Sequence, residues 1–218
     1  GTINGNGHII QQITIPAGND GGLIGKSCNA VIDNLTLTNF SHSSGSTGIG
    51  ALVGSAACSL TVDNVKVTSS SFTSTTGGRI GGLIGYFSGT NITVSNSMTD
   101  ATVTCKNYCG GLMGILEASA VSSIDNTYTK GNTIHTTSSP ESDLGGFIGV
   151  VNSLGVSINI SNSYTTGTVT GSGPNVGGFI GAHKANGIII NSYSTGLVSN
   201  DTSDHTGGFI GLVSGAST

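Results

Sequence analysis

The chain has few charges and few aromatic side chains. Only 7% of its residues are charged, 5% are aromatic, and tryptophan is absent. The six basic and ten acidic side chains give a net charge of −4 and form no basic run. Proteins that bind nucleic acid neutralise phosphates with clustered lysine and arginine, so we expect no nucleic-acid partner.

Long apolar runs and helical patterns are also missing. The longest apolar stretches, such as 187–190, are far shorter than the roughly 20 residues needed to cross a bilayer, so we expect no membrane insertion. No segment places apolar residues at helical spacing, and the 37 glycines and many β-branched residues argue against helix. A mean hydropathy of +0.18 with so little charge is not typical of a disordered chain.

What the sequence does contain is one pentad, repeated seven times. It consists of a glycine, a second small residue, two large apolar residues and a glycine. The spacing between successive pentads runs from 29 residues (21 to 50) to 35 residues (110 to 145). The copies are Gly21–Gly25, Gly50–Gly54, Gly81–Gly85, Gly110–Gly114, Gly145–Gly149, Gly177–Gly181 and Gly207–Gly211.

An asparagine keeps phase with the pentad in the middle of each unit. A β-branched residue always stands two positions before it: Ile32, Val62, Val94, Ile124, Ile160 and Ile189. Two columns in phase establish an internal repeat. The asparagines are Asn34, Asn64, Asn96, Asn126, Asn162 and Asn191.

Each unit has the composition of short strands joined by polar corners. Runs such as 60–67 alternate apolar and polar residues, as half-buried strands do. A unit of about 30 residues with two or three such strands matches one coil of a solenoid. We therefore predict an all-β fold, a single β-solenoid domain (parallel β-helix) spanning 1–218, with about seven coils.

Stacked coils place equivalent residues above one another at about 4.8 Å, so each column becomes a ladder. The third pentad position gives Leu23, Leu52, Leu83, Leu112, Phe147, Phe179 and Phe209. The fourth gives Ile24, Val53, Ile84, Met113, Ile148, Ile180 and Ile210. Neighbours on a strand point to opposite faces. Either the pentad bends or is covered on both faces, or the second ladder is an exposed stripe available for assembly.

Several segments together resemble the GLUG repeat family. They are Gly1–Ile10 (GTINGNGHII), the pentads, Asn162–Val169 (NSYTTGTV) and Asn191–Val198 (NSYSTGLV). The resemblance covers essentially the whole chain and is strongest after residue 145. It implies a right-handed β-solenoid in a large secreted or surface protein, such as an adhesin or the non-catalytic region of an IgA-cleaving metalloprotease. The family brings no catalytic residues.

The four cysteines pair by position. Cys28 and Cys58 each lie six residues before a column asparagine, so they are neighbours on adjacent coils, within disulfide range. Cys105 and Cys109 flank a short corner loop. We predict the disulfides Cys28–Cys58 and Cys105–Cys109 over a zinc site, because the two pairs lie at least two coils apart.

The asparagine column is expected to form an inward, hydrogen-bonded ladder that holds a corner. Asparagine is also the acceptor in five N-glycosylation motifs, which with the cysteines predict a secreted or cell-surface protein. The better acceptors are Asn39, Asn91, Asn159 and Asn200, since Asn34 also belongs to the ladder.

Metal binding and catalysis have little support. Asp33, Asp63 and Asp125 share one column position, but their oxygens are too few for a Ca²⁺ site. The five histidines belong to different coils without a partner motif, and we expect each on a surface loop. We predict no enzyme activity, no cofactor and no metal. The histidines are His8, His42, His135, His183 and His205.

The leading functional hypothesis is an extracellular structural or adhesive solenoid, either a stalk segment or a subunit stacking end to end into a fibre. Its motivation is that no polar cap is recognisable at either end of the repeats, where strand edges would pair with another copy or with flanking sequence. The expected partners are the chain itself and a glycan or host-surface ligand. The alternatives are a carbohydrate- or ice-binding module and, with less support, a polysaccharide-active enzyme.

Overall fold

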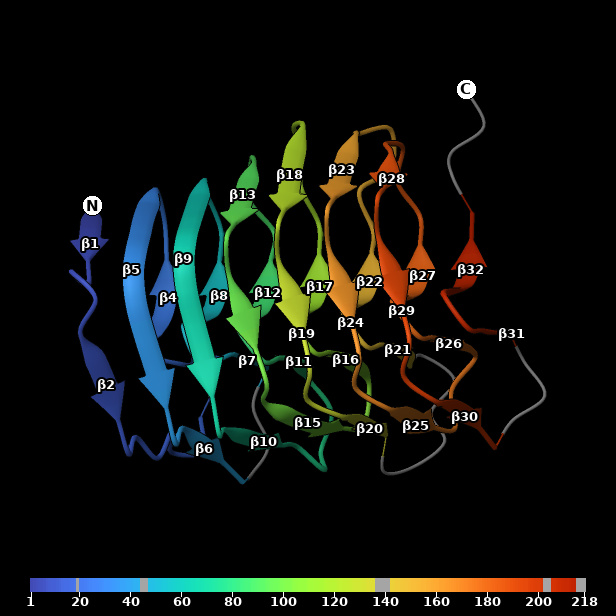
Figure 1. Cartoon of the computed structure of the whole chain (residues 1–218), viewed down its shortest axis with the longest axis horizontal. Coiled ribbons are helices and arrows are strands. Elements are labelled where there is room, and N and C mark those ends of the chain that lie inside the picture. Colours follow the sequence, from blue (N-terminus) through green and yellow to red (C-terminus); the bar gives the residue numbers. More distant parts are fainter. Residues whose placement is uncertain (19, 44–46, 136–141, 202–204, 215–218) are drawn as a thin grey trace.

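The chain folds into a stack of coils built from four parallel sheets (Figure 1). A computed structural model describes residues 1–18, 20–43, 47–135, 142–201 and 205–214. These residues form 32 strands and no helix. In Figure 1 the front strands run downward and the rear strands upward while the chain advances from left to right, which makes the coil right-handed. The all-β solenoid of about seven coils is confirmed.

The front sheet has twelve strands and carries the asparagine column. In the second and third coils one long strand passes through the asparagine, whereas in later coils the strand is divided there. Its strands are β1 (Thr2–Asn4), β2 (Ile9–Gln11), β5 (Ala30–Thr38), β9 (Leu60–Thr68), β13 (Ile92–Ser95), β14 (Met98–Thr99), β18 (Ser122–Asp125), β19 (Tyr128–Thr129), β23 (Ile158–Ser161), β24 (Tyr164–Thr165), β28 (Ile189–Ile190) and β29 (Tyr193–Ser194).

Two shorter sheets close the lower side of each coil in Figure 1. The base sheet contains β6 (Ser41–His42), β10 (Ser71–Thr73), β15 (Thr102–Cys105), β20 (Thr133–His135), β25 (Val169–Gly171) and β30 (Val198–Asn200). The corner sheet contains β3 (Asp20–Gly21), β7 (Gly48–Ile49), β11 (Arg79–Gly81), β16 (Tyr108–Gly110), β21 (Asp143–Gly145), β26 (Asn175–Gly177) and β31 (His205–Gly207).

The rear sheet follows each pentad. It contains β4 (Ile24–Ser27), β8 (Val53–Ala56), β12 (Ile84–Phe87), β17 (Met113–Leu116), β22 (Ile148–Val151), β27 (Ile180–His183) and β32 (Ile210–Val213). The register keeps the predicted columns: Ile84, for example, pairs with Val53 on one side and with Met113 on the other. The repeat in the sequence is therefore the repeat of the coil.

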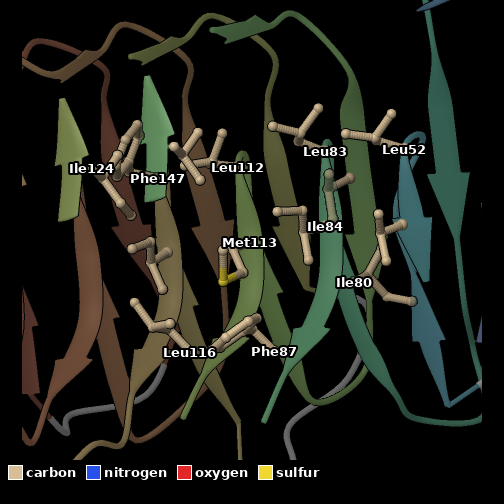
Figure 2. Packing of buried hydrophobic residues seen from close by; sticks show 14 of the residues in the cluster. Leu52, Ile80, Leu83, Ile84, Phe87, Leu112, Met113, Leu116, Ile124 and Phe147 are labelled. Atoms are coloured by element: carbon tan, nitrogen blue, oxygen red, sulfur yellow. The ribbon is translucent and has the colours of Figure 1, made fainter. Parts of the chain in front are cut away.

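The pentad bends, and this buries both of its apolar ladders. Its first glycine ends a corner strand, its second and third residues form a bend, and its fourth residue begins a rear strand. Leu83 and Ile84 consequently both face the interior and are fully buried. Figure 2 shows Leu52, Leu83, Leu112 and Phe147 in one row, with Ile84 and Met113 in the next.

The exposed-stripe alternative for the fourth pentad position is therefore wrong. Its central members Val53, Ile84, Met113, Ile148 and Ile180 are fully buried, and the end members Ile24 and Ile210 are half-buried and pack against the same core. The last glycine of the pentad makes the bend possible. A β-carbon on Gly85 would lie 2.6 Å from the Gly54 carbonyl oxygen and 2.8 Å from that of Arg79, so the corner and rear sheets approach too closely for a side chain.

The asparagine column turns outward, not inward. All six asparagines adopt the left-handed conformation, with φ between 46° and 54°, which asparagine tolerates better than most residues. This one residue shifts the in-and-out alternation of the strand, so that Ile32 and Leu35 both face the core while Asn34 stays outside. The expectation of an inward ladder is wrong for that reason.

Candidate assembly surfaces at the two ends

Apolar exposure is concentrated at the two ends of the solenoid. Among the described residues, eleven large hydrophobic side chains are exposed, and eight of them belong to the first or last coil. The first coil exposes Ile3, Ile9 and Ile13, and the last coil exposes Ile188, Ile190, Tyr193, Leu197 and Val213. A single exposed apolar residue is normal, but a cluster on one face marks an interaction surface.

Strand edges are open at the same two ends. At the N-terminal end β1, β2, β3 and β4 each pair with a strand of the second coil, and within the described residues nothing pairs with their other edge. At the other end β28, β29, β30, β31 and β32 pair only with strands of the coil before, again counting described strands alone. Unpaired backbone N–H and C=O groups of this kind are templates for a further strand.

Two aromatic stacks end openly at the C-terminal coil. The rings of Tyr128, Tyr164 and Tyr193 are stacked at centroid distances of 4.8 and 5.0 Å on the outer face of the front sheet. The Lys130 ammonium lies 5.2 Å from the Tyr128 ring centroid, while the last ring, Tyr193, is 50% exposed. The pKa of Tyr164, the middle ring, is raised, and burial is the main cause.

The second stack lies inside the solenoid. Phe147, Phe179 and Phe209 follow one another at 4.5 and 4.9 Å. The first two rings are fully buried, whereas Phe209, in the last coil, is half-buried. Another coil at this end would cover both Tyr193 and Phe209.

The outward column of the corner sheet carries polar side chains toward the same end. The Asn175 amide donates to Asp143 Oδ1 at 2.6 Å, and a His205 ring nitrogen lies 3.0 Å from Asn175 Oδ1. Lys184 Nζ lies 3.9 Å from Asp143 Oδ2. Burial raises the pKa of Asp143, while the Asn175 hydrogen bond and the Lys184 charge oppose that shift. His205, at the end of the column, is exposed.

The asparagine ladder is hydrogen-bonded along the axis, as predicted. The amide of Asn64 donates to Asn34 Oδ1 at 2.9 Å, and Asn126 donates to Asn96 in the same way at 2.8 Å. Where the ladder continues past an aspartate, the amide uses the carboxylate instead: Asn162 donates to Asp125 Oδ1 at 2.8 Å. Hydrogen bonds from Ser161 and Asn162 lower the pKa of Asp125.

Both predicted disulfides are present. Cys28 of the first coil bonds to Cys58 of the second, with Cα atoms 4.6 Å apart, and Cys105 bonds to Cys109 across a corner loop. No cysteine among the described residues is left for zinc. Disulfides form in oxidising compartments, which points away from the cytoplasm.

The glycosylation candidates differ in how their side chains are engaged. Asn39 is exposed just after β5, with a left-handed φ of 57°. Asn91 accepts from Ser59 Oγ, and Asn159 accepts from the Ile188 backbone N–H. Asn200 donates to the Gly173 carbonyl oxygen, and Asn34 belongs to the ladder. Of the five, Asn39 is the most accessible acceptor.

A hollow of about 560 Å³ lies along the turns that lead from the rear strands β8, β12, β17 and β22 to the front strands that follow them, in the second to fifth coils. Glu117 accepts from the Tyr86 hydroxyl at 2.6 Å and from the Asn152 amide at 2.9 Å. Burial, and next the Glu117 hydrogen bond, raise the pKa of Tyr86. Exposed Ser119 and Leu154 complete a polar and apolar lining. The repeat pattern does not reveal this hollow, because the positions around it carry different residues from coil to coil: the position of Tyr86 holds Ser55 in the coil before and Ile115 in the coil after.

The histidines do not come together. His42 and His183 are buried, so the expectation of surface loops is wrong for these two, because both face inward on strands. Burial lowers the pKa of His183. The side chain of His135 lies outside the described residues. The described part of the chain holds no group of three or more His, Cys, Asp or Glu side chains placed for a metal, and no helix suited to crossing a membrane.

The fold defines the class: a parallel β-solenoid repeat protein with disulfides and open ends. A crystal structure from Bacteroides ovatus, described as a "putative immunoglobulin A1 protease", matches 97% of this chain and 68% of its own with a TM-score of 0.70. At 20% sequence identity the likeness shows the fold alone. No family model and no curated protein matches the sequence.

Proposed function

We propose that this chain is an extracellular structural rod whose ends join to further β-coils, either as a subunit of a fibre or as a segment of a stalk. The observation that carries the proposal is the coincidence of open strand edges and exposed apolar side chains at both ends. Solitary repeat proteins shield such ends with polar caps. Ends with open strand edges and exposed apolar side chains are suited to pairing with a further coil.

The body of the molecule suits a rod. Each column is held along the axis by backbone ladders, by asparagine amides such as Asn64 to Asn34, and by stacked rings such as Phe147 on Phe179. Each coil contacts its neighbours, so stability grows as coils are added. Such a rod resists bending and places whatever it carries at a fixed distance.

The extracellular location rests on three supports. The disulfides require an oxidising compartment, the accessible Asn39 lies in a glycosylation motif, and the sequence resembles repeats of secreted surface proteins. The Bacteroides ovatus neighbour is described as a protease. We propose that the present chain is not itself catalytic, because its described residues hold no group of three or more His, Cys, Asp or Glu side chains placed for a metal ion, and its histidines lie in different coils.

The test is assembly of the purified chain. Light scattering coupled to gel filtration and negative-stain electron microscopy should show rods whose length grows with protein concentration. A species of one chain's mass at every concentration, with no rods in the images, would rule out joining of copies. Rods that grow when coils of the same repeat are added genetically to either end would support the stalk segment instead.

A second candidate function is carbohydrate binding in the hollow beside Glu117. A carboxylate held by Tyr86 and Asn152, with hydroxyls and the apolar Leu154 nearby, offers the mix of groups that binds sugars. A glycan array, with Glu117→Ala as the comparison, tests it. Binding that survives the substitution, or no binding at all, ends this proposal, and turnover of a bound glycan would make the chain an enzyme.

Ice binding finds less support. The outward column of the front sheet passes from Thr36 through Lys66 and Met98 to Tyr128, so it offers no continuous threonine row.

A further inference from the structure

We infer that copies of this chain join head to tail, with the first coil of one copy taking the place of the next coil of its neighbour, and that His205 of one copy meets Asp20 of the other at the joint. The inference rests on the proposed function, because it specifies the partner and the register of the same end surfaces.

The backbone supports this polarity. At the C-terminal end, β29, β31 and β32 offer free edges of the front, corner and rear sheets, and at the N-terminal end β2, β3 and β4 offer the opposite edges of the same three sheets. All ladders in the rod are parallel. A head-to-tail copy continues each ladder in the same sense and with the same coil outline.

Two copies that meet through their C-terminal ends would not continue the parallel ladders. A two-fold axis perpendicular to the rod reverses the strand direction in one copy, so the joint would pair strands antiparallel in a rod that is otherwise parallel. It would also form a closed dimer. Head-to-tail joining leaves one free end of each kind and therefore produces an open filament.

The side-chain columns match at this joint. Ile189 ends the inward column that Ile3 begins, and Ile210 ends the column that Ile24 begins. On the outer face, Tyr193 ends the column in which Ile9 is the first member. Ile9 is 62% exposed and Tyr193 is 50% exposed. Joining the ends covers apolar side chains with apolar side chains in every one of these columns.

The corner sheet adds a pair of an acidic and a basic side chain. Its outward column begins at Asp20, passes through Gly48 and Arg79, and ends at Asn175 and His205. A continued register places Asp20 of the next copy one rung from His205, where strands are about 4.8 Å apart. The strands packed against β31, namely β26, β30 and β32, carry no titratable side chain. Asp143 lies two rungs down the column, and Lys184, which follows the rear strand β27, lies 3.9 Å from Asp143 Oδ2. Asp20 is thus the nearest charge that the register brings to His205.

The experiment uses two single charge substitutions that complement each other. His205→Asp places two carboxylates at every joint, and Asp20→Lys places a lysine against His205. Each variant alone should need about tenfold more protein than wild type for half-maximal assembly by light scattering, because like charges meet or the attraction is lost. An equimolar mixture should assemble near the wild-type concentration, since alternating copies place an acidic side chain against a basic one at every joint.

Val121→Asp, an exposed position in the middle of the rod, is the matched control and should assemble like wild type. Melting curves of the unassembled variants check folding, and the mixture provides its own control because misfolded chains would not rescue each other. If wild type forms no rods, the proposed joining of copies fails. If wild type forms rods but the mixture behaves like its two components, the rods stand and the head-to-tail register is overturned.

Discussion

The rings of Tyr164 and Tyr193 lie face to face, with centroids 5.0 Å apart and planes inclined by 3°. Tyr164 is covered on both faces, by Tyr128 and by Tyr193, whereas Tyr193 is covered on one. The last ring of the stack is therefore the one that a further coil would contact. Tyr193 therefore lies where the next copy would join, whereas Tyr164 lies inside the rod.

Tyr193→Ala should weaken assembly of the chain. The substitution removes apolar surface that the proposed joint buries, and about a tenfold higher concentration should be needed for half-maximal light scattering. Tyr128→Ala is the matched control, because that ring contacts Tyr164 and lies two coils before the last one. It should lower the melting temperature slightly and leave the assembly concentration unchanged. Equal effects of the two substitutions would contradict the assignment of Tyr193 to the joint.

The Cys28–Cys58 disulfide should stabilise the first coil far more than Cys105–Cys109 stabilises its corner. The first bond closes a loop with a sequence separation of 30 residues and the second closes one of only 4. On the chain-entropy account the longer loop contributes about 3 to 4 kcal/mol. Replacing both cysteines of the first pair by serine should speed amide hydrogen exchange in residues 20–28, with a smaller and local effect for the second pair. Similar exchange in both variants would contradict this ranking.

Phe147→Ala should strongly destabilise the rod. This ring is fully buried and stacked on Phe179, and removing a buried phenylalanine costs about 3 to 5 kcal/mol. Urea denaturation followed by circular dichroism measures the change in the free energy of unfolding. Val121→Ala, on a 64% exposed side chain, is the control and should change it by less than about 0.5 kcal/mol.

Asp143 and Asp125 should give opposite pH dependences of stability. Burial raises the pKa of Asp143, so its favourable contribution is present below its unfolded pKa, near pH 4 by the ~3.9 of a free aspartate, and is lost as the pH rises through the folded value. Asp143→Asn should therefore gain stability relative to wild type as the pH is raised from about 4 to about 8. The measurement is the free energy of unfolding in urea at each pH.

Asp125→Asn provides the comparison of opposite sign. Hydrogen bonds from Ser161 and Asn162 lower the pKa of Asp125, so its contribution is present above the unfolded pKa and is lost as the pH falls through the folded value. This variant should be less stable than wild type at neutral pH, and the difference should narrow in acid. Parallel pH profiles for the two variants would show that the different surroundings of the two carboxyls are not responsible.

The sequence alone determined the architecture of the coil. The pentad and the Asn34 to Asn191 column recur at the length of one coil, and like residues in register can only stack, so the all-β solenoid follows from periodicity. The same phase placed Cys28 beside Cys58, because residues equally distant from a column asparagine occupy the same place on adjacent coils. One repeated unit leaves little freedom in how the next one packs.

The tertiary structure alone decided which way the columns face. A pattern of alternating residues assumes a straight strand, but the bend at Leu83 turns both Leu83 and Ile84 into the core, and the left-handed φ of Asn34 moves its side chain outside. The hydrogen bond from Tyr86 to Glu117 could not be predicted either, because the residue at the Tyr86 position changes from coil to coil, from Ser55 to Tyr86 to Ile115. Periodicity fixes which residues stack along the axis, whereas the backbone torsions at a corner fix the direction of each side chain across it.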